Sequence, residues 1–205
     1  MRRYIPLLVL LASQSVFADR PNDWTKVMGD IEVQEGEQAG NVRSVNGDIE
    51  LEDNSSAESV KTTNGRIRVG NYVTAEDLAT VNGSIRAGES LRVNEDVRTV
   101  NGSIRLKQRS IVTGSVNTVN GSVELTGTQV GEDVKTTNGD IELRNSSVDG
   151  DIIFEKVSYN SWNQSYPTLM IDADSKVHGT IYLRRKVNLR ISDSAEVGEI
   201  KREYQ

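Results

Sequence analysis

The chain of 205 residues contains no cysteine, one histidine and few aromatic residues, which make up 5% of the total. Without cysteine no disulfide can form, so the fold depends on its core and its backbone hydrogen bonds. The single histidine, His178, leaves no histidine-based triad and no cluster with zinc-ligand spacing. It stands beside Gly179 at an outward position, and we expect an ordinary surface residue. This aromatic content is low for a globular core but ordinary for coils stacked from valine, isoleucine and leucine.

Basic residues are also in the minority, with 24 lysines and arginines against 30 acidic residues. Two of the basic residues lie in the first 18 positions, so the rest of the chain carries 22 − 30 = −8. An acidic surface argues against nucleic acid or an anionic membrane as the main partner. The glycine-and-aspartate nonapeptides of calcium-binding β-rolls are missing, so no metal or cofactor is expected.

The first residues follow the order of a secretory signal peptide. Arg2 and Arg3 give a charged start, residues 5–12 form an apolar run, and a small-x-small cleavage site ends at Ala18. The apolar run is too short to span a bilayer, and no later stretch is long enough. No cysteine follows the cleavage site for lipid attachment. We therefore predict a signal peptide at residues 1–18 and a periplasmic or secreted protein without a transmembrane segment.

A short phrase, Thr-Val-Asn-Gly-Ser-Ile-Arg, returns with small changes along most of the chain. Its Asn-Gly pair begins at positions 46, 64, 82, 101, 120 and 138, so the successive intervals are 18, 18, 19, 19 and 18. A nearly fixed period of this size is the signature of a repeat architecture. The repeated asparagines are Asn46, Asn64, Asn82, Asn101, Asn120 and Asn138, and the glycines are Gly47, Gly65, Gly83, Gly102, Gly121 and Gly139.

Two topologies fit short alternating segments on either side of each Asn-Gly pair. Asn-Gly between alternating strands is a strong hairpin signal, which would give a barrel or meander of hairpins. In a β-solenoid, each unit is instead one coil and equivalent residues stack on one another. Only the solenoid explains why Thr, Asn, Gly and Ile recur together, and strands of about four or five residues are marginal for a closed barrel.

We therefore predict an all-β, single-domain β-solenoid, a parallel β-helix with about 18 residues per coil and three short sides. A right-handed winding follows from the bias of parallel crossovers. A left-handed hexapeptide helix is the rival, but the longer interval of the repeat does not divide by six. Roughly seven to nine coils at about 4.8 Å each would give a rod about 35–45 Å long.

The corner residues then have structural roles. The glycine is expected to turn the corner with positive φ, where a side chain would clash. The asparagines can hydrogen-bond along their column, as asparagine ladders do in cross-β structures. The serine or threonine two positions before each asparagine can do the same more weakly.

The remaining segments fall around the repeats. Residues 19–27 are a polar lead-in in which Trp24 is expected to cap the open end of the first coil. The repeats occupy residues 28–157. Residues 158–170 interrupt the pattern with Tyr159, Trp162, Tyr166 and a proline, and are expected to form an aromatic loop insertion. Residues 171–205 contain further coils and a charged tail that we expect to fray from Lys201.

The repeated Thr-Val-Asn-Gly-Ser-Ile units resemble a bacterial β-strand-repeat family labelled as adhesins, a domain of unknown function, over about Met28 to Val157. That resemblance implies surface interaction and supplies no catalytic residues. The Val-x-Gly-x-Ile units from Val148 onward are similar to the coils of bactofilins, which are polymer-forming solenoids. Bactofilins are generally cytoplasmic, whereas this chain begins with a predicted signal peptide, so the similarity implies shared architecture more than a shared role.

Two groups of residues are candidate contacts. The outward position after each Asn-Gly reads Glu-Glu-Arg-Arg-Arg-Glu-Glu along the rod, which places a basic stripe in an acidic rod. This is either a solvated face with cross-strand pairs or a binding site for an acidic polysaccharide that uses Arg66, Arg68, Arg86 and Arg105. The aromatic loop either offers Tyr159, Trp162 and Tyr166 to a sugar or protein partner, or folds Trp162 back onto a coil.

The sequence favours a non-enzymatic, exported β-helix protein that acts as a structural or adhesin-like module of the bacterial cell envelope. Its partner would be an envelope protein or glycan, and the chain would be monomeric or associate end to end. One alternative is a β-helix protein that binds or degrades polysaccharide. Another is a self-assembling scaffold similar to bactofilins. No catalytic residue is assigned.

Overall fold

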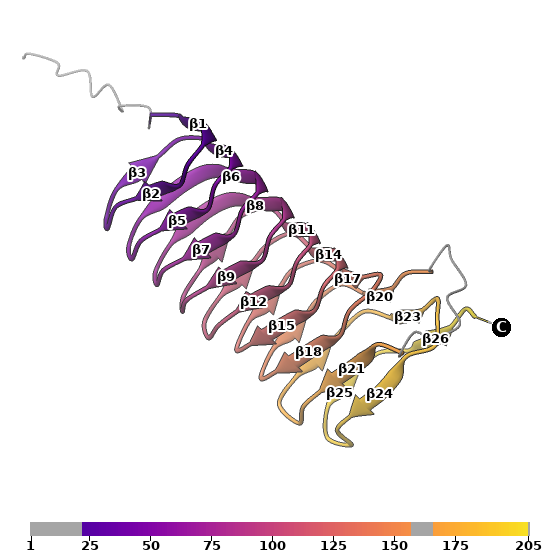
Figure 1. Ribbon diagram of the computed structural model, residues 1–205. Coiled ribbons are helices and arrows are strands. Elements are labelled where there is room, and N and C mark those ends of the chain that lie inside the picture. The colour runs from indigo at the N-terminus through magenta and orange to yellow at the C-terminus, as the bar shows by residue number, and fades with distance from the viewer. Residues whose placement is uncertain (1–21, 157–165, 205) are drawn as a thin grey trace, which may run out of the picture.

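The computed structural model describes residues 22–156 and 166–204, and all secondary-structure elements in these residues are β-strands. The chain winds into coils stacked along one axis (Figure 1), and neighbouring coils pair in parallel throughout, as β4 (Val42–Asn46) does with β6 (Ser56–Asn64). The predicted β-solenoid is therefore confirmed, and a hairpin meander, which needs antiparallel pairs, is excluded. The predicted signal peptide lies outside the described residues.

Each coil has three faces, as the sequence predicted. Face 1 carries the strand that leads into the Asn-Gly pair, face 2 the strand that follows it, and face 3 the short strand that closes the coil. Face 2 is a separate sheet of nine strands, one per coil, so the rod contains nine coils and is about 40 Å long at about 4.8 Å per coil. Faces 1 and 3 form one sheet of 17 strands, because β6 and β8 run round their shared corner without a break.

The strands of face 1 are β1 (Trp24–Met28), β4, β6, β8 (Thr74–Asn82), β11 (Val97–Asn101), β14 (Val116–Asn120), β17 (Val134–Thr136), β20 (Ile152–Phe154), β23 (Ile181–Leu183) and β26 (Ile200–Arg202). Those of face 2 are β2 (Ile31–Val33), β5 (Ile49–Leu51), β7 (Ile67–Val69), β9 (Ile85–Ala87), β12 (Ile104–Leu106), β15 (Val123–Thr126), β18 (Ile141–Arg144), β21 (Thr168–Ile171) and β24 (Asn188–Ile191). Face 3 adds β3 (Gln38–Ala39), β10 (Arg92–Val93), β13 (Ile111–Val112), β16 (Gln129–Val130), β19 (Ser147–Val148), β22 (Lys176–Val177) and β25 (Glu196–Val197).

The core is a set of inward columns in which aliphatic side chains stack on their equivalents one coil away. On face 2, Ile104 lies in register with Ile85 on one side and Val123 on the other, and all three are fully buried. At the N-terminal end, Trp24 lies in register with Val42 and packs against the core, in the place predicted for a cap.

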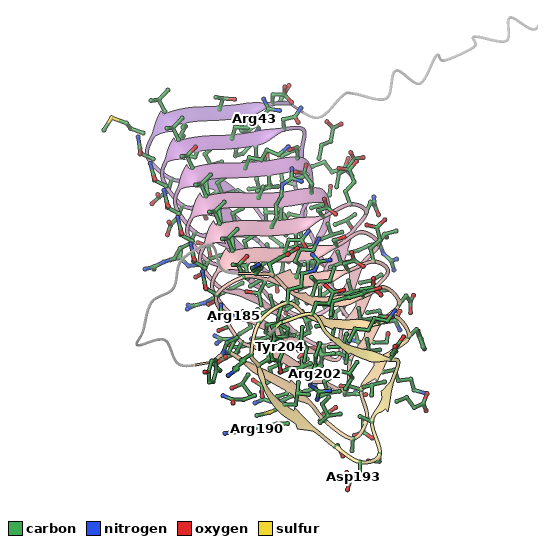
Figure 2. The ribbon with its side chains drawn as sticks, turned by 90° about the vertical axis from the view of Figure 1, so that its right-hand side faces the viewer. Arg43, Arg185, Arg190, Asp193, Arg202 and Tyr204 are labelled. Atoms are coloured by element: carbon green, nitrogen blue, oxygen red, sulfur yellow. The ribbon has the colours of Figure 1, made fainter. Side chains whose placement is uncertain are left out.

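The C-terminal tail is more ordered than the sequence suggests. Strand β26 pairs with β23, where Ile200 lies in register with Ile181, and Tyr204 packs against the core. Figure 2 labels Arg202 and Tyr204 among the last coils. The expectation of fraying from Lys201 was wrong, because Ile200 and Tyr204 anchor the charged residues between them to the last coil.

The longer interval between Asn82 and Asn101 has a simple cause at one corner. Between faces 3 and 1, the inward residues Ala75 and Leu78 are three positions apart, whereas Val93 and Val97 are four apart. That extra residue lengthens the coil. Later coils keep the extra residue between faces 3 and 1. Their interval is nevertheless shorter again, because they have one residue fewer between faces 2 and 3, near Gly127.

The predicted asparagine ladder is present at the corner between faces 1 and 2. The Asn101 side chain donates from Nδ2 to Oδ1 of Asn82 at 2.8 Å, and its own Oδ1 accepts from Nδ2 of Asn120 at 2.8 Å. The same bond joins every pair of neighbours from Asn46 to Asn138. The ladder therefore links six consecutive coils through side chains that are mostly exposed to solvent.

We expect Asn101→Ala to lower the free energy of unfolding by about 1–2 kcal/mol, because two side-chain hydrogen bonds are lost. Asn46 is a matched control at the start of the ladder, since within the described residues its side chain makes a single hydrogen bond, which it accepts from Asn64. Asn46→Ala should cost about half as much. Urea denaturation of both variants measures the difference. An Asn101→Ala protein with unchanged stability would show that the ladder adds nothing to the fold.

The glycines of the Asn-Gly pairs are needed for a different reason from the one predicted. Positive φ among described glycines occurs at Gly29, Gly36 and Gly127, and not at the repeated corner. A Cβ at any of the six corner glycines would instead overlap the carbonyl oxygen of the glycine one coil earlier. Because that oxygen belongs to the backbone, no side-chain rotamer relieves the overlap. The prediction of positive φ was therefore wrong here, and the close stacking of coils selects glycine.

The hydroxyl column beside the ladder also bonds differently from the prediction. The buried Thr99 donates from Oγ1 to the carbonyl oxygen of Gly83, one coil earlier, at 2.8 Å. Thr62, Thr80 and Thr118 make the equivalent bond at 2.9–3.0 Å. These hydroxyls therefore satisfy the glycine carbonyls rather than one another.

Left-handed backbone does recur in each of the first seven coils, at the corner between faces 2 and 3. The residues with φ between 46° and 72° there are Gly36, Asn54, Tyr72, Ser90, Arg109, Gly127 and Asn145. Glycine and asparagine adopt this conformation readily, whereas tyrosine, serine and arginine do so at a cost. Bonds to the next coil hold the backbone in place, as between the Tyr72 amide and the Glu89 carbonyl at 2.9 Å.

Candidate ligand-binding groove

The arginine stripe predicted on face 2 is present and stacked in register. Arg68 lies beside Arg86, and Arg86 beside Arg105, with Glu50 and Glu124 at the two ends. A hollow of about 730 Å³ lies over this part of face 2. The hollow also contains acidic side chains, because its lining includes Glu35, Glu50, Glu52 and Asp53 besides the three arginines and Lys107.

Ion pairs neutralise much of this stripe. Arg105 makes a bidentate pair with Glu124, with Nε and Nη2 at 2.6 and 2.7 Å from the carboxylate oxygens. The Arg105 hydrogen bond lowers the pKa of Glu124 below its usual value. Arg68 lies 3.0 Å from Asp48. Within the described residues, Arg66 and Arg86 make no ion pair. The structure therefore favours a solvated face with cross-strand pairs over a strongly basic binding stripe.

The structure describes the chain on either side of the aromatic loop, up to Lys156 and from Tyr166. Tyr159 and Trp162 lie outside the described residues, and strand β21 begins at Thr168, within the range 158–170 assigned to the insertion. Lys156 and Tyr166, the described residues on either side, show that the insertion replaces the Asn-Gly corner of its coil, between faces 1 and 2. Tyr166 is half exposed, and Nζ of Lys186 lies 5.9 Å from its ring centroid.

A groove that the sequence reasoning missed runs along face 1 from Thr25 to Glu155, with a volume of about 850 Å³. Two outward columns line it, since outward residues of a strand lie two positions apart and stack from coil to coil. The first column, here called the basic rail, reads Thr25, Arg43, Lys61, Ala79, Arg98, Asn117 and Lys135. The second, the valine row, reads Val45, Thr63, Val81, Val100, Val119 and Thr137.

The valine row has no part in the core. Val45, Val81, Val100 and Val119 are 39–43% exposed, and each lies between an inward threonine or serine and a ladder asparagine. Isolated surface valines are ordinary, but a continuous exposed apolar row is typical of an interaction surface. The row therefore gives the groove an apolar side along most of its length.

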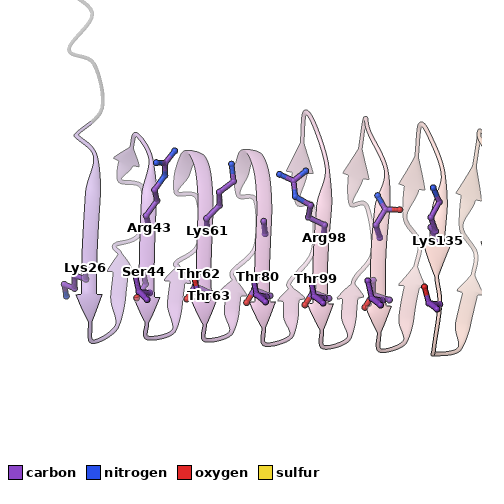
Figure 3. Close-up of a pocket in the computed structure, with 18 of the residues that line it drawn as sticks. Lys26, Arg43, Ser44, Lys61, Thr62, Thr63, Thr80, Arg98, Thr99 and Lys135 are labelled. Carbon is purple, nitrogen blue, oxygen red and sulfur yellow. The ribbon is translucent and has the colours of Figure 1, made fainter. Parts of the chain in front are cut away.

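The basic rail lies parallel to the valine row, and Figure 3 shows Arg43, Lys61, Arg98 and Lys135 in one line across successive coils. Nζ of Lys61 and Nη2 of Arg98 lie 3.0 and 3.6 Å from Oδ2 of the buried Asp77. This oxygen has no partner in hydrogen-bond geometry, so charge attraction alone holds it.

Within the described residues, the basic side chains near the two ends of the rail are the ones that make no ion pair. Arg98 is shared between Asp77 and Asp96, the latter at 3.3 Å, whereas Arg43 and Lys135 make no ion pair with the described part of the chain. Together with Lys26, five basic side chains line the groove against one acidic side chain, Glu155. The groove is therefore a cationic surface on an acidic protein.

The C-terminal end of the groove is closed by the chain after β23. Arg185 donates from Nη1 to the Thr137 carbonyl at 2.7 Å and to Oδ1 of Asn138 at 2.8 Å, which also ends the asparagine ladder. In Figure 2, Arg43 lies among the first coils and Arg185 farther along the stack. One coil beyond Lys135, Ile153 occupies the rail column and is buried. The groove thus has one closed end, at its C-terminal side.

A signal for this groove is present in the sequence. The valine of the repeated Thr-Val-Asn-Gly phrase stands at an outward position, where the core gives no reason for an apolar residue. Two positions earlier, the outward residues are basic in four of six repeats: Arg43, Lys61, Arg98 and Lys135. The outward residues before each Asn-Gly, and not only those after it, thus indicate both the valine row and the basic rail.

The histidine and the possibility of a metal site were also considered from the sequence. His178 is exposed, as predicted, and Nδ1 lies 2.9 Å from Oδ1 of the exposed Asp149. The two described segments bring together no group of three histidine, aspartate or glutamate side chains that could hold a metal ion.

Comparisons of the chain with protein-family models, with curated proteins and with solved structures find no match. Residues 22–156 and 166–204 contain no helix long and apolar enough to cross a membrane.

Proposed function

We propose that the protein is an exported, non-enzymatic β-solenoid that acts as an adhesin-like interaction module of the bacterial cell envelope. The observation that carries the proposal is the groove on face 1, where an exposed valine row and a basic rail repeat over several coils. An exposed apolar row that makes no contribution to the core is typical of an interaction surface. The resemblance of the repeats to an adhesin-labelled family and the predicted signal peptide support the same role.

Two measurements test this proposal. Expressed with the predicted signal peptide in place in a Gram-negative bacterium, the protein should appear in the periplasm or medium with Asp19 as its first residue, by mass spectrometry. The processed chain should then co-sediment with isolated envelope fragments in a saturable way. A cytoplasmic, unprocessed chain would contradict export, and absence of saturable binding would contradict the interaction role.

The catalytic alternative has its own readout. A polysaccharide-degrading β-helix protein would release new reducing ends or unsaturated products from envelope or plant acidic polysaccharides. We expect neither to accumulate above a boiled control. Sustained product release by the purified chain would replace the non-enzymatic proposal.

A self-assembling scaffold is the second candidate function, favoured by the unpaired strand edge at the N-terminal end of the described rod. The outer edge of β1 has no partner strand among the described residues, and Val27 and Met28 near it are 67% and 79% exposed. Unpaired strand edges are templates for pairing with another chain. Sedimentation velocity over a wide concentration range separates the two candidates, since a scaffold forms long assemblies and an adhesin-like module sediments as one rod.

A further inference from the structure

We propose that the groove on face 1 binds a linear acidic polysaccharide, with the glycan chain extended along the rod axis. The inference deepens the proposed function and rests on it, because it names the partner of the interaction surface. It is carried by three properties of the groove: its direction, the side chains that line it, and the distribution of its charge.

The direction of the groove selects a linear partner. It crosses successive face-1 strands at right angles, so each coil adds one side chain to the basic rail and one to the valine row. From Arg43 to Lys135 the rail rises by five coils, about 24 Å at about 4.8 Å per coil. One pyranose ring extends along its chain about as far as one coil extends along the rod, so an extended glycan can meet each coil with equivalent atoms.

The two columns favour a ligand that carries negative groups along one side and an apolar face along the other. The basic rail offers Arg43, Lys61, Arg98 and Lys135 to negative groups along one side. The valine row offers methyl groups to the C–H face of a sugar ring along the other. A phospholipid has its charge at one end only, so it would leave most of the rail unused.

Other anionic polymers match less well. Polyphosphate and nucleic acid backbones present no apolar face toward the valine row. A peptide laid across the strands would leave its amide groups unpaired, because the face-1 strands already bond to their neighbours in the sheet. An acidic glycan has no backbone amides to satisfy, and its hydroxyls can remain in water.

Charge supports the same partner. The whole chain has a net charge of −6, so an anionic ligand would be repelled by most of its surface and drawn to the rail. Arg43 and Lys135, which make no ion pair within the described segments, stand near the two ends of the rail. A ligand that contacts both must span the groove, which predicts that affinity rises with chain length.

The test uses fluorescently labelled polygalacturonate, with heparin as a second acidic glycan and dextran as the neutral control. Fluorescence anisotropy at about 50 mM salt should show saturable binding of an acidic glycan that weakens steeply as salt is raised, as for polyelectrolyte ligands. Oligomers of about four sugars should bind at least tenfold more weakly than chains long enough to fill the groove. Dextran should not bind.

Two double variants with equal change of charge locate the site. Arg43→Gln with Lys135→Gln removes unpaired cations from the groove, and we expect about tenfold weaker binding, or about threefold per cation. Arg66→Gln with Arg86→Gln removes two cations that make no ion pair within the described residues, one at the corner before β7 and one on face 2, and we expect less than a twofold change. Val100→Glu, at an exposed position of the valine row, should also weaken binding at least tenfold while circular dichroism and thermal unfolding remain unchanged.

The opposite results overturn the inference. Failure of both acidic glycans to bind, or weakening by the Arg66 and Arg86 pair and not by the groove pair, rejects the groove as a glycan site. Binding of the wild-type chain to phosphatidylglycerol vesicles, with no binding to either glycan, assigns the groove to lipid and also rejects it. If envelope fragments still bind the groove variants in full, the interaction role stands while the groove inference fails.

Discussion

Gly102→Ala is expected to lower the free energy of unfolding by about 3–5 kcal/mol, a large effect for a single added methyl group. The added Cβ would overlap the carbonyl oxygen of Gly83 and lie 2.9 Å from the amide nitrogen of Ser84. Both atoms belong to the backbone of the preceding coil. Relief therefore requires two coils to separate, which breaks parallel hydrogen bonds and opens the core beneath them.

Ser103→Ala is the matched control, because Ser103 is the next residue and its side chain points away from the core. Its Oγ accepts one 3.3 Å bond from the Ser122 amide, so its loss should cost less than about 1 kcal/mol. Urea denaturation followed by circular dichroism compares the two variants. A Gly102→Ala protein as stable as Ser103→Ala would mean that the coils are not stacked as closely as the structure has them.

The glycine shows how far the sequence alone can reach. The period of the Asn-Gly pairs and the matched Thr and Ile neighbours predict the solenoid, its three faces and the asparagine ladder, because these depend on residue identity at a fixed repeat. The reason for glycine was predicted wrongly. A single repeat suggests a turn with positive φ, and only the stacked coils bring one glycine carbonyl against the next.

The candidate site was predictable in part. The arginine column of face 2 was read correctly as stacked, since the residue after each Asn-Gly alternates clearly with the core. Its neutralisation by cross-strand pairs was one of the two interpretations, but the particular pairs were not predicted, because Arg105–Glu124 and Arg68–Asp48 join different coils or different strand positions. The groove on face 1 was not predicted, because only the outward residues after each Asn-Gly were considered, whereas its valines and basic residues stand before it.

The second large effect is expected at Ile104, which is fully buried in the middle of the rod. Ile104→Ala should lower the free energy of unfolding by about 3–4 kcal/mol, through lost burial and the cavity left between Ile85 and Val123. Both neighbours lie in register with Ile104 in the face-2 sheet, so two coil interfaces are weakened at once. Urea and thermal unfolding measure the loss.

Ile191 provides the matched comparison at the end of the rod. It is partly exposed and lies in register with Ile171 on one side, with no coil beyond it in the described chain. Ile191→Ala should therefore cost about 1 kcal/mol or less. In a stack stabilised by nearest-neighbour interfaces, a central defect separates two blocks of coils, whereas a terminal defect only frays one end. Ile104→Ala should thus also broaden or split the unfolding transition, and equal, fully cooperative transitions for the two variants would contradict this account of the rod.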